Sequence, residues 1–154
     1  MDELSREEAL EVLATLPVAH LGMVEEGHPY VTPMSFVLDD DRILFRTVAG
    51  RKLDCLRANP SVCIEASRYD EESGEWVSVI INGTAVEVDD DSVKQKLVSQ
   101  LFRKYEHVMG SPLTRGDGLQ AIAGQPHVIE VTINDLTGMV SGRGWARRTR
   151  PGRL

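Results

Sequence analysis

The sequence FRTVAGRK contains the residue types that bind a phosphate group, at short spacing. Arg51 and Lys52 directly follow Gly50, and Arg46 and Thr47 stand a few positions before it. Guanidinium and ammonium groups pair with phosphate oxygens, a hydroxyl adds a hydrogen-bond donor, and a glycine lets backbone amides approach an anion closely. This segment predicts an anion site, with an ordinary solvated surface as the competing interpretation.

A helix is expected to begin at this segment. The run from 51 to 58 is helix-like and is followed by Asn59 and Pro60, and a proline disfavours helical geometry in the residue before it. Arg51 and Lys52 would then lie in the first turn, where a cation is unfavourable beside the helix dipole unless an anion compensates. The predicted position of the helix therefore supports the anion site.

Strand-like runs lie on both sides of this helix. Pro33 falls inside one of them and cannot donate to a strand ladder, so that run is expected to contain a bulge or to lie at an edge. Gly83 falls inside the longest run and predicts a bend. The first three runs are joined by hairpin-length turns, which indicates an antiparallel meander. Strands are expected at 18–24, 29–38, 42–47, 61–67, 76–88, 127–133 and 137–142.

Two further helices are indicated by capping residues and apolar spacing. Ser5 and Glu8 form a capping box, and Pro17 ends the helix that follows. Ser92 is the expected cap of a second helix, over residues 90–105, that is amphipathic. The apolar face of this second helix is expected to consist of Val93, Leu97, Leu101 and Tyr105.

The length and the order of these elements predict the fold class. A chain of 154 residues is the usual size of one domain. About six antiparallel strands with added helices predict a mainly β protein, a small barrel with its edges closed. We expect one domain over residues 1–144 and a basic C-terminal tail over residues 145–154.

Charge and hydropathy argue against several kinds of partner. The net charge is −7, from 24 acidic and 17 basic residues, which disfavours binding of nucleic acid or of anionic lipid. No apolar run approaches the roughly 20 residues that cross a bilayer, and the acidic start is unlike a secretion signal. These features predict a cytoplasmic protein with neither a nucleic-acid nor a membrane partner.

Cysteines and histidines suggest neither a metal site nor a disulfide framework. Cys55 and Cys63 are expected as reduced thiols, on a helix and in a strand respectively. The histidines are scattered and lack the spacing of metal ligands. We assign them no role and expect no metal.

The ordered set GHPYVTPMSFVL, FRTVAGRKLDCLRANPSV and WVSVIINGTAVEV resembles the pyridoxamine 5′-phosphate oxidase-like, FMN-binding split-barrel family. The resemblance runs from residue 5 to about residue 144. In length and in its PYVTP strand the chain is most similar to the nitroimidazole-reductase branch, whose members typically have a histidine where Arg46 stands, and to uncharacterised flavoproteins. The resemblance implies a six-stranded antiparallel split barrel and a homodimer that holds FMN at the subunit interface.

The resemblance also implies roles for particular residues. Arg46, Thr47, Arg51 and Lys52 would hold the FMN phosphate and the ribityl chain. The segment Thr32, Pro33, Met34 and Ser35 would run along the isoalloxazine ring, and Ser78 would offer it a polar side chain. Trp76 would pack against the cofactor or else lie in the core or the subunit interface. Trp145 would stack on the flavin of the partner subunit or else cover an end of the barrel.

The implied function is an FMN-dependent oxidoreductase that acts on a small molecule with electrons from a reduced nicotinamide or a similar donor. Three alternatives stay open: a non-catalytic flavin-binding or sensing protein, a deazaflavin-dependent reductase of the same fold, and a dimeric barrel without a cofactor. Haem is less favoured, because no histidine is indicated as an axial ligand. The tail arginines, Arg147, Arg148, Arg150 and Arg153, would bind an anionic substrate or be solvated. Vitamin B6 oxidation is not indicated, because the chain ends in GWARRTRPGRL where true pyridoxamine 5′-phosphate oxidases carry a longer section.

Overall fold

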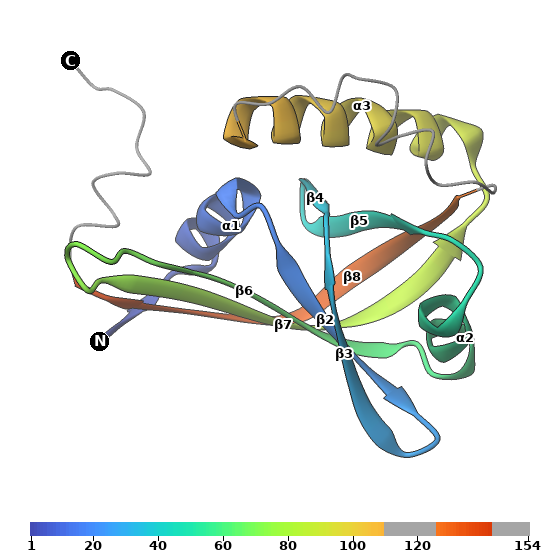
Figure 1. The fold of residues 1–154 in the computed structure, drawn as a ribbon, viewed down its shortest axis with the longest axis horizontal. Coiled ribbons are helices and arrows are strands. Elements are labelled where there is room, and N and C mark those ends of the chain that lie inside the picture. The colour runs from blue at the N-terminus through green and yellow to red at the C-terminus, as the bar shows by residue number, and fades with distance from the viewer. Residues whose placement is uncertain (110–125, 143–154) are drawn as a thin grey trace.

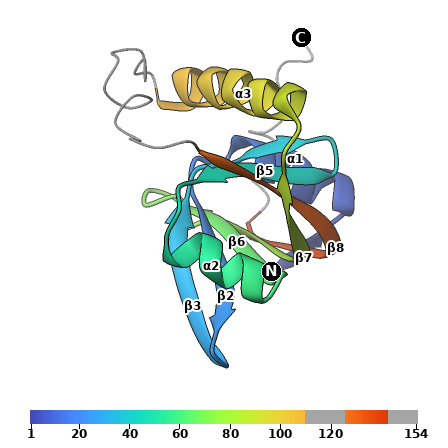
Figure 2. The same cartoon turned by 90° about the vertical axis from the view of Figure 1, so that its right-hand side faces the viewer.

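The computed structural model describes residues 1–109 and 126–142, and it consists of one antiparallel sheet with three helices against it (Figures 1 and 2). The strands pair in the order β3-β2-β6-β7-β8-β5-β4, and β1 adds to β8. The strands are β1 (Asp2–Leu4), β2 (Ala19–Glu25), β3 (His28–Met34), β4 (Val37–Asp39), β5 (Arg42–Thr47), β6 (Ser61–Tyr69), β7 (Trp76–Val88) and β8 (His127–Ser141). The helices are α1 (Arg6–Thr15), α2 (Arg51–Ala58) and α3 (Asp91–Met109).

The class predicted from the sequence, mainly antiparallel β with added helices, is confirmed. The sheet has eight strands where six were expected. The run 29–38 divides into β3 and β4, and the runs 127–133 and 137–142 form the single strand β8. β1 was not predicted, because three residues are too few to show an alternating pattern. The tail 145–154 lies outside the described residues.

Within the described residues, β3 and β4 lie at the two ends of the strand order, and no pairing between them closes the sheet. β3 is an edge strand, so it can contain Pro33. Proline has no backbone N–H to donate, and an edge strand has one side on which no donor is needed. β7 and β8 form the longest ladder, and its register shifts between Asn82 and Gly83. A side chain on Gly83 would meet Val131 and the carbonyl oxygen of Thr132, so this bend requires the glycine predicted for it.

α1 begins at the predicted capping box. The Ser5 hydroxyl accepts a hydrogen bond from the Glu8 amide at 3.2 Å, and the Glu8 carboxylate accepts one from the Ser5 amide at 2.9 Å. The helix buries Ala9, Val12 and Leu13 in the main hydrophobic core. This packing holds the start of the chain against the sheet.

α3 lies across β4 and β5 and builds a second core (Figure 1). Its cap is Asp90, whose carboxylate accepts from the Ser92 amide at 2.8 Å; Ser92 itself lies inside the helix, so the predicted cap was wrong by two positions. The predicted apolar face is confirmed: Leu97, Leu101 and Tyr105 are buried, and Val93 packs against them. No helix in the described ranges is long and apolar enough to cross a membrane.

Candidate functional site

The candidate site is the junction between the end of β5 and the start of α2. Gly50 is the N-terminal cap of α2, with a φ of +155° that side-chain-bearing residues rarely adopt and without any side-chain cap. Apart from the adjacent residues of the chain, no described atom lies within 4 Å of the position where its Cβ would stand. The first amides of a helix have no partner within the helix, so this open end suits an anion.

Two half-buried cations lie on either side of this glycine. Arg46 is near the end of β5 and Lys52 is in the first turn of α2. Burial lowers the pKa of both side chains, and neither forms an ion pair with a carboxylate in the part of the chain that the structure describes. Cations that have lost water without gaining a counter-charge favour a bound anion.

Arg51 is placed differently. Its guanidinium Nε donates to Glu25 at 2.6 Å, and the group stacks over the Tyr30 ring with 3.9 Å to the centroid. The hydrogen bond from Arg51, and then one from the Cys55 thiol at 3.2 Å, lower the pKa of Glu25. Arg51 therefore ties the N-terminal turn of α2 to the β2–β3 hairpin, a role that the sequence did not indicate.

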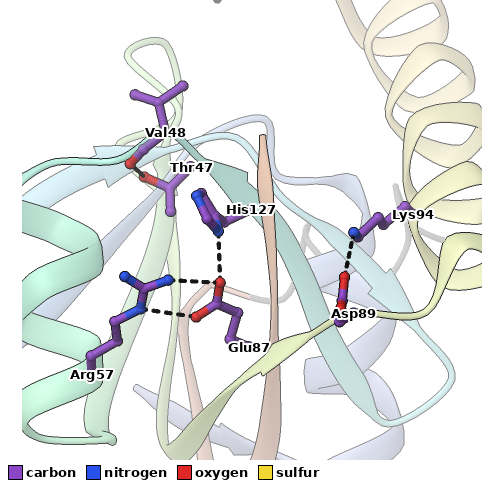
Figure 3. A network of polar contacts seen from close by, with 7 residues as sticks. All are labelled: Thr47, Val48, Arg57, Glu87, Asp89, Lys94 and His127. Atoms are coloured by element: carbon purple, nitrogen blue, oxygen red, sulfur yellow. Dashed lines mark hydrogen bonds and ion pairs between the residues drawn. The ribbon is translucent and has the colours of Figure 1, made fainter. Parts of the chain in front are cut away.

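The other end of α2 is anchored by an ion-pair network (Figure 3). Arg57 donates twice to Glu87, at 3.0 Å each, and His127 Nδ1 lies 2.6 Å from the same carboxylate. Thr47 pairs with His127 across β5 and β8, and Figure 3 shows their side chains next to each other. The network joins α2 to β7 and β8, and so fixes the helix whose first turn carries Lys52.

The predicted segment from Thr32 to Ser35 lies along the edge strand. Pro33 and Ser35 are exposed and Thr32 is half-buried, whereas the Met34 side chain is buried in the core. An edge strand carries backbone N–H and C=O groups without a partner on one side. This segment can therefore offer backbone hydrogen bonds to a ligand, but not the Met34 side chain.

Ser78 is not brought to the junction. It lies near the start of β7 and three strands from β3 in the sheet order, whereas the end of β5 lies near the other end of β7, where Arg46 and Val88 both pair with Val128. Its hydroxyl donates to Glu65 at 3.4 Å, and the other oxygen of Glu65 lies 3.1 Å from His20 Nδ1. The outer face of the sheet thus carries a polar row that includes His20 and Glu65, two residues to which the sequence assigned no role.

Of the two tryptophans, Trp76 lies within the described residues. Trp76 begins β7, half-buried, opposite Tyr69 and Ser141. Trp145 and the tail arginines lie outside the described residues. Of the residues predicted to bind the cofactor, Arg46, Gly50 and Lys52 therefore form the best-supported anion site, beside the edge strand β3.

Comparisons with known proteins agree with this fold. The sequence pattern of the pyridoxamine 5′-phosphate oxidase family matches residues 5–140. An uncharacterized protein of Rhizobium meliloti is 29% identical over 80 residues, which is 52% of this chain and 52% of that protein, so the match spans about half of its length.

Two solved structures share the fold at low sequence identity. A FAD-binding protein from Mesorhizobium loti superimposes with a TM-score of 0.73 at 22% identity, over 92% of this chain and 98% of that one. A candidate 5-nitroimidazole antibiotic resistance protein from Bacteroides thetaiotaomicron gives a TM-score of 0.70 at 20% identity, over 90% of this chain and 86% of that one.

Proposed function

Because the chain belongs to the pyridoxamine 5′-phosphate oxidase family, we propose that it is a flavoprotein whose flavin phosphate binds at the β5–α2 junction. The observation that carries the proposal is the pair of half-buried cations, Arg46 and Lys52, without a carboxylate partner in the described residues and next to the open cap at Gly50. The FAD-binding protein of the same fold supports a flavin as the ligand.

Each group at the junction has a distinct part in holding the phosphate. Lys52 and Arg46 supply charge in a site that is partly shielded from water, where such contacts are strongest. The first amides of α2 donate hydrogen bonds, and Gly50 allows the close approach. Thr47 adds a hydroxyl, which donates a long hydrogen bond of 3.3 Å to the Val48 carbonyl.

The flavin ring is proposed to lie along the edge of β3. Backbone groups from Thr32 to Ser35 would bond its polar atoms, and Pro33 would present a carbonyl but no N–H. Bound there, the flavin supplies hydride and electron transfer, while the chain orients the ring and limits the access of water. We propose an oxidoreductase that acts on a small molecule with a reduced nicotinamide or a similar donor.

FMN is favoured over FAD because the cationic set is compact. Arg46, Arg51 and Lys52 fall within seven positions, which suits one terminal phosphate. The next cation along α2, Arg57, is paired twice with Glu87. A deazaflavin, whose anionic tail needs a longer basic groove, is the alternative cofactor.

A homodimer is part of the proposal. The outer face of the sheet exposes Val31 by 60% and Ile80 by 45%, and it also carries the row of Ser78, Glu65 and His20. Exposed apolar side chains on a sheet face favour a partner surface. Ser78 is too far from β3 of its own protomer to contact the flavin proposed there, so its predicted role would need the second copy.

The test is a thermodynamic cycle on the full-length protein. FMN and riboflavin, which differ by the phosphate, are titrated into the wild type and into Lys52→Met. We expect Lys52→Met to weaken FMN binding roughly tenfold or more, since one charge-assisted contact to the phosphate is lost, and to leave the affinity for riboflavin within about twofold of the wild type. Lys94→Met, on α3 and paired with Asp89, is the matched control and should change neither.

The same preparation separates the proposed activity from binding alone. FMN retained through gel filtration is mixed anaerobically with NADH or NADPH, and the loss of the oxidised flavin absorption is followed. Reduction, then reoxidation by an added acceptor, supports an oxidoreductase. Retained FMN that no donor reduces would instead identify a non-catalytic flavin-binding protein, and equal losses of FMN and riboflavin affinity in Lys52→Met would disprove the phosphate site.

A further inference from the structure

A cleft with a volume of about 580 Å³ lies between α1, β4 and α3, away from the β5–α2 junction. Ala14 and Thr15 of α1 and Val37 and Leu38 of β4 form one wall. Figure 1 shows α3 above these elements and away from α2. This volume is typical of sites for small molecules, and the wall offers contacts to an apolar body.

Lys104 lines this cleft and is mostly buried without a counter-ion in the described residues. Its ammonium group donates to the Phe36 carbonyl at 3.0 Å and lies 3.5 Å from the centroid of the Phe36 ring. The ring and the carbonyl favour the cation, while burial lowers the pKa of Lys104 to about 7. A negative charge in the cleft would stabilise this cation.

Two guanidinium groups, those of Arg103 and Arg68, also line the cleft. No carboxylate occurs among its described lining residues. The nearest acid along β4, Asp39, is neutralised by Arg42 at 2.8 Å and Lys96 at 2.8 Å. Lys104 and Arg103 offer two cations at this cleft, in a chain whose net charge is −7.

Gln100 adds a buried hydrogen-bond acceptor at this cleft. Its amide Nε2 donates to Asp39 at 3.2 Å, which fixes the orientation of the amide because a carboxylate can only accept. Its Oε1 is buried and has no hydrogen-bond partner in the described part of the protein. A buried acceptor without a donor is costly, and a small donor such as a hydroxyl would satisfy it.

We propose that this cleft binds a small organic carboxylate with an apolar body and a hydroxyl group. The carboxylate pairs with Lys104 and Arg103, the body packs against Val37 and Leu38, and the hydroxyl donates towards Gln100. The site shares no residue with the β5–α2 junction, so it goes beyond the proposed flavin function.

Three probes separate the parts of this ligand. Benzoate has the charge and the apolar ring, 3-hydroxybenzoate adds the donor, and 3-hydroxybenzyl alcohol keeps the donor without the charge. Titration calorimetry on the full-length protein is expected to show one 3-hydroxybenzoate per chain. Benzoate should bind about fivefold more weakly and the alcohol at least about tenfold more weakly.

Two variants test the assignment to the cleft. Lys104→Met keeps the length of the side chain and removes the charge, and it should weaken 3-hydroxybenzoate at least about tenfold. Lys94→Met on the same helix lies outside the cleft and should bind within twofold of the wild type. If Lys104→Met loses its far-ultraviolet circular dichroism, Arg103→Met at the same cleft takes its place, with a weaker loss expected.

Amide chemical shifts of the wild type give a readout that needs no variant. Adding 3-hydroxybenzoate should move the amides of Val37, Leu38 and Gln100 and leave Gly50 and Lys52 unmoved. Shifts confined to Gly50 and Lys52 would place the anion at the flavin site and overturn the proposal. The proposal would also be overturned if 3-hydroxybenzyl alcohol bound as tightly as 3-hydroxybenzoate, if folded Lys104→Met kept its affinity, or if neither benzoate nor 3-hydroxybenzoate bound.

Discussion

The hydroxyl group of Tyr105 donates to the carbonyl oxygen of Pro17 at 2.6 Å, and through this contact α3 is joined to the segment that follows α1. The hydroxyl oxygen of Tyr105 also accepts a hydrogen bond from the Phe36 amide at 3.2 Å. One side chain therefore joins three segments that are distant in sequence.

Replacing Tyr105 with phenylalanine should reduce stability. Tyr105→Phe leaves the Phe36 amide and the Pro17 carbonyl without this partner, and we expect the free energy of unfolding to fall by about 1–3 kcal/mol. Urea denaturation measures the change. Tyr69→Phe is the control, because Tyr69 is 63% exposed, and it should change stability by less than about 0.5 kcal/mol.

Replacing Glu25 with glutamine should strengthen binding of FMN. The Glu25 carboxylate pairs with Arg51 and competes with a phosphate for it. Glu25→Gln removes this competition, and we expect FMN to bind roughly two- to fivefold more tightly while riboflavin is unchanged. Fluorescence titration of both ligands measures this, with Glu26→Gln as the control one residue away. Weaker FMN binding in Glu25→Gln would mean that Glu25 positions Arg51 instead of competing for it.

Asp39 should make stability depend on pH in the acid range. Burial alone would raise its pKa, but hydrogen bonds from Lys96, Arg42 and Gln100 outweigh this and lower the pKa from 3.8 to about 2. The unfolded chain therefore binds more protons between these values, so stability is fully present above about pH 4 and is lost as the pH falls towards 2.

The Asp39→Asn variant tests this dependence. We expect it to lower the free energy of unfolding by roughly 2 kcal/mol at pH 7 and to flatten the loss between pH 4 and pH 2. Urea denaturation across this range measures both effects. Asp41→Asn, at an exposed position in the next turn, should retain the wild-type slope.

Lys104 should add a dependence of the same sign at higher pH. Its pKa falls from 10.5 to about 7 on folding, so between these values the unfolded chain binds the proton and the folded chain does not. Stability should therefore rise with pH over this range, by at most about 1.4 kcal/mol per unit. In urea denaturation from pH 7 to pH 10, the free energy of unfolding of Lys104→Met should rise less steeply with pH than that of the wild type. Lys94→Met should not reduce this slope.

The sequence predicted the parts of the site that depend on neighbouring residues. Asn59 and Pro60 end α2, Gly50 precedes it, and these local signals placed Arg51 and Lys52 in a first helical turn. Gly83 predicted the bend in β7 for the same reason. Such features follow from the backbone preferences of a few adjacent residues.

The features of the site that the sequence did not predict depend on contacts between segments that are far apart in the sequence. Arg51 meets Glu25 and Tyr30 only because the β2–β3 hairpin folds back on α2. Ser78 lies far from β3 because β2 and β6 intervene in the sheet order, which chain order does not reveal. Local patterns predict the elements, but the contacts of a side chain depend on which strands become neighbours.

The position of β8 in the sheet has a consequence for synthesis of the protein. β8 pairs with β7 along its length, with β5 through residues 42–47, and with β1 through residues 2–4. β1 therefore stays without its partner until β8 is made, and β5 and β7 each lack one neighbour until residues 127–141 have left the ribosome. Pairing between such distant segments is slow, so the nascent chain exposes apolar strand faces for most of its synthesis and is then a natural client for chaperones.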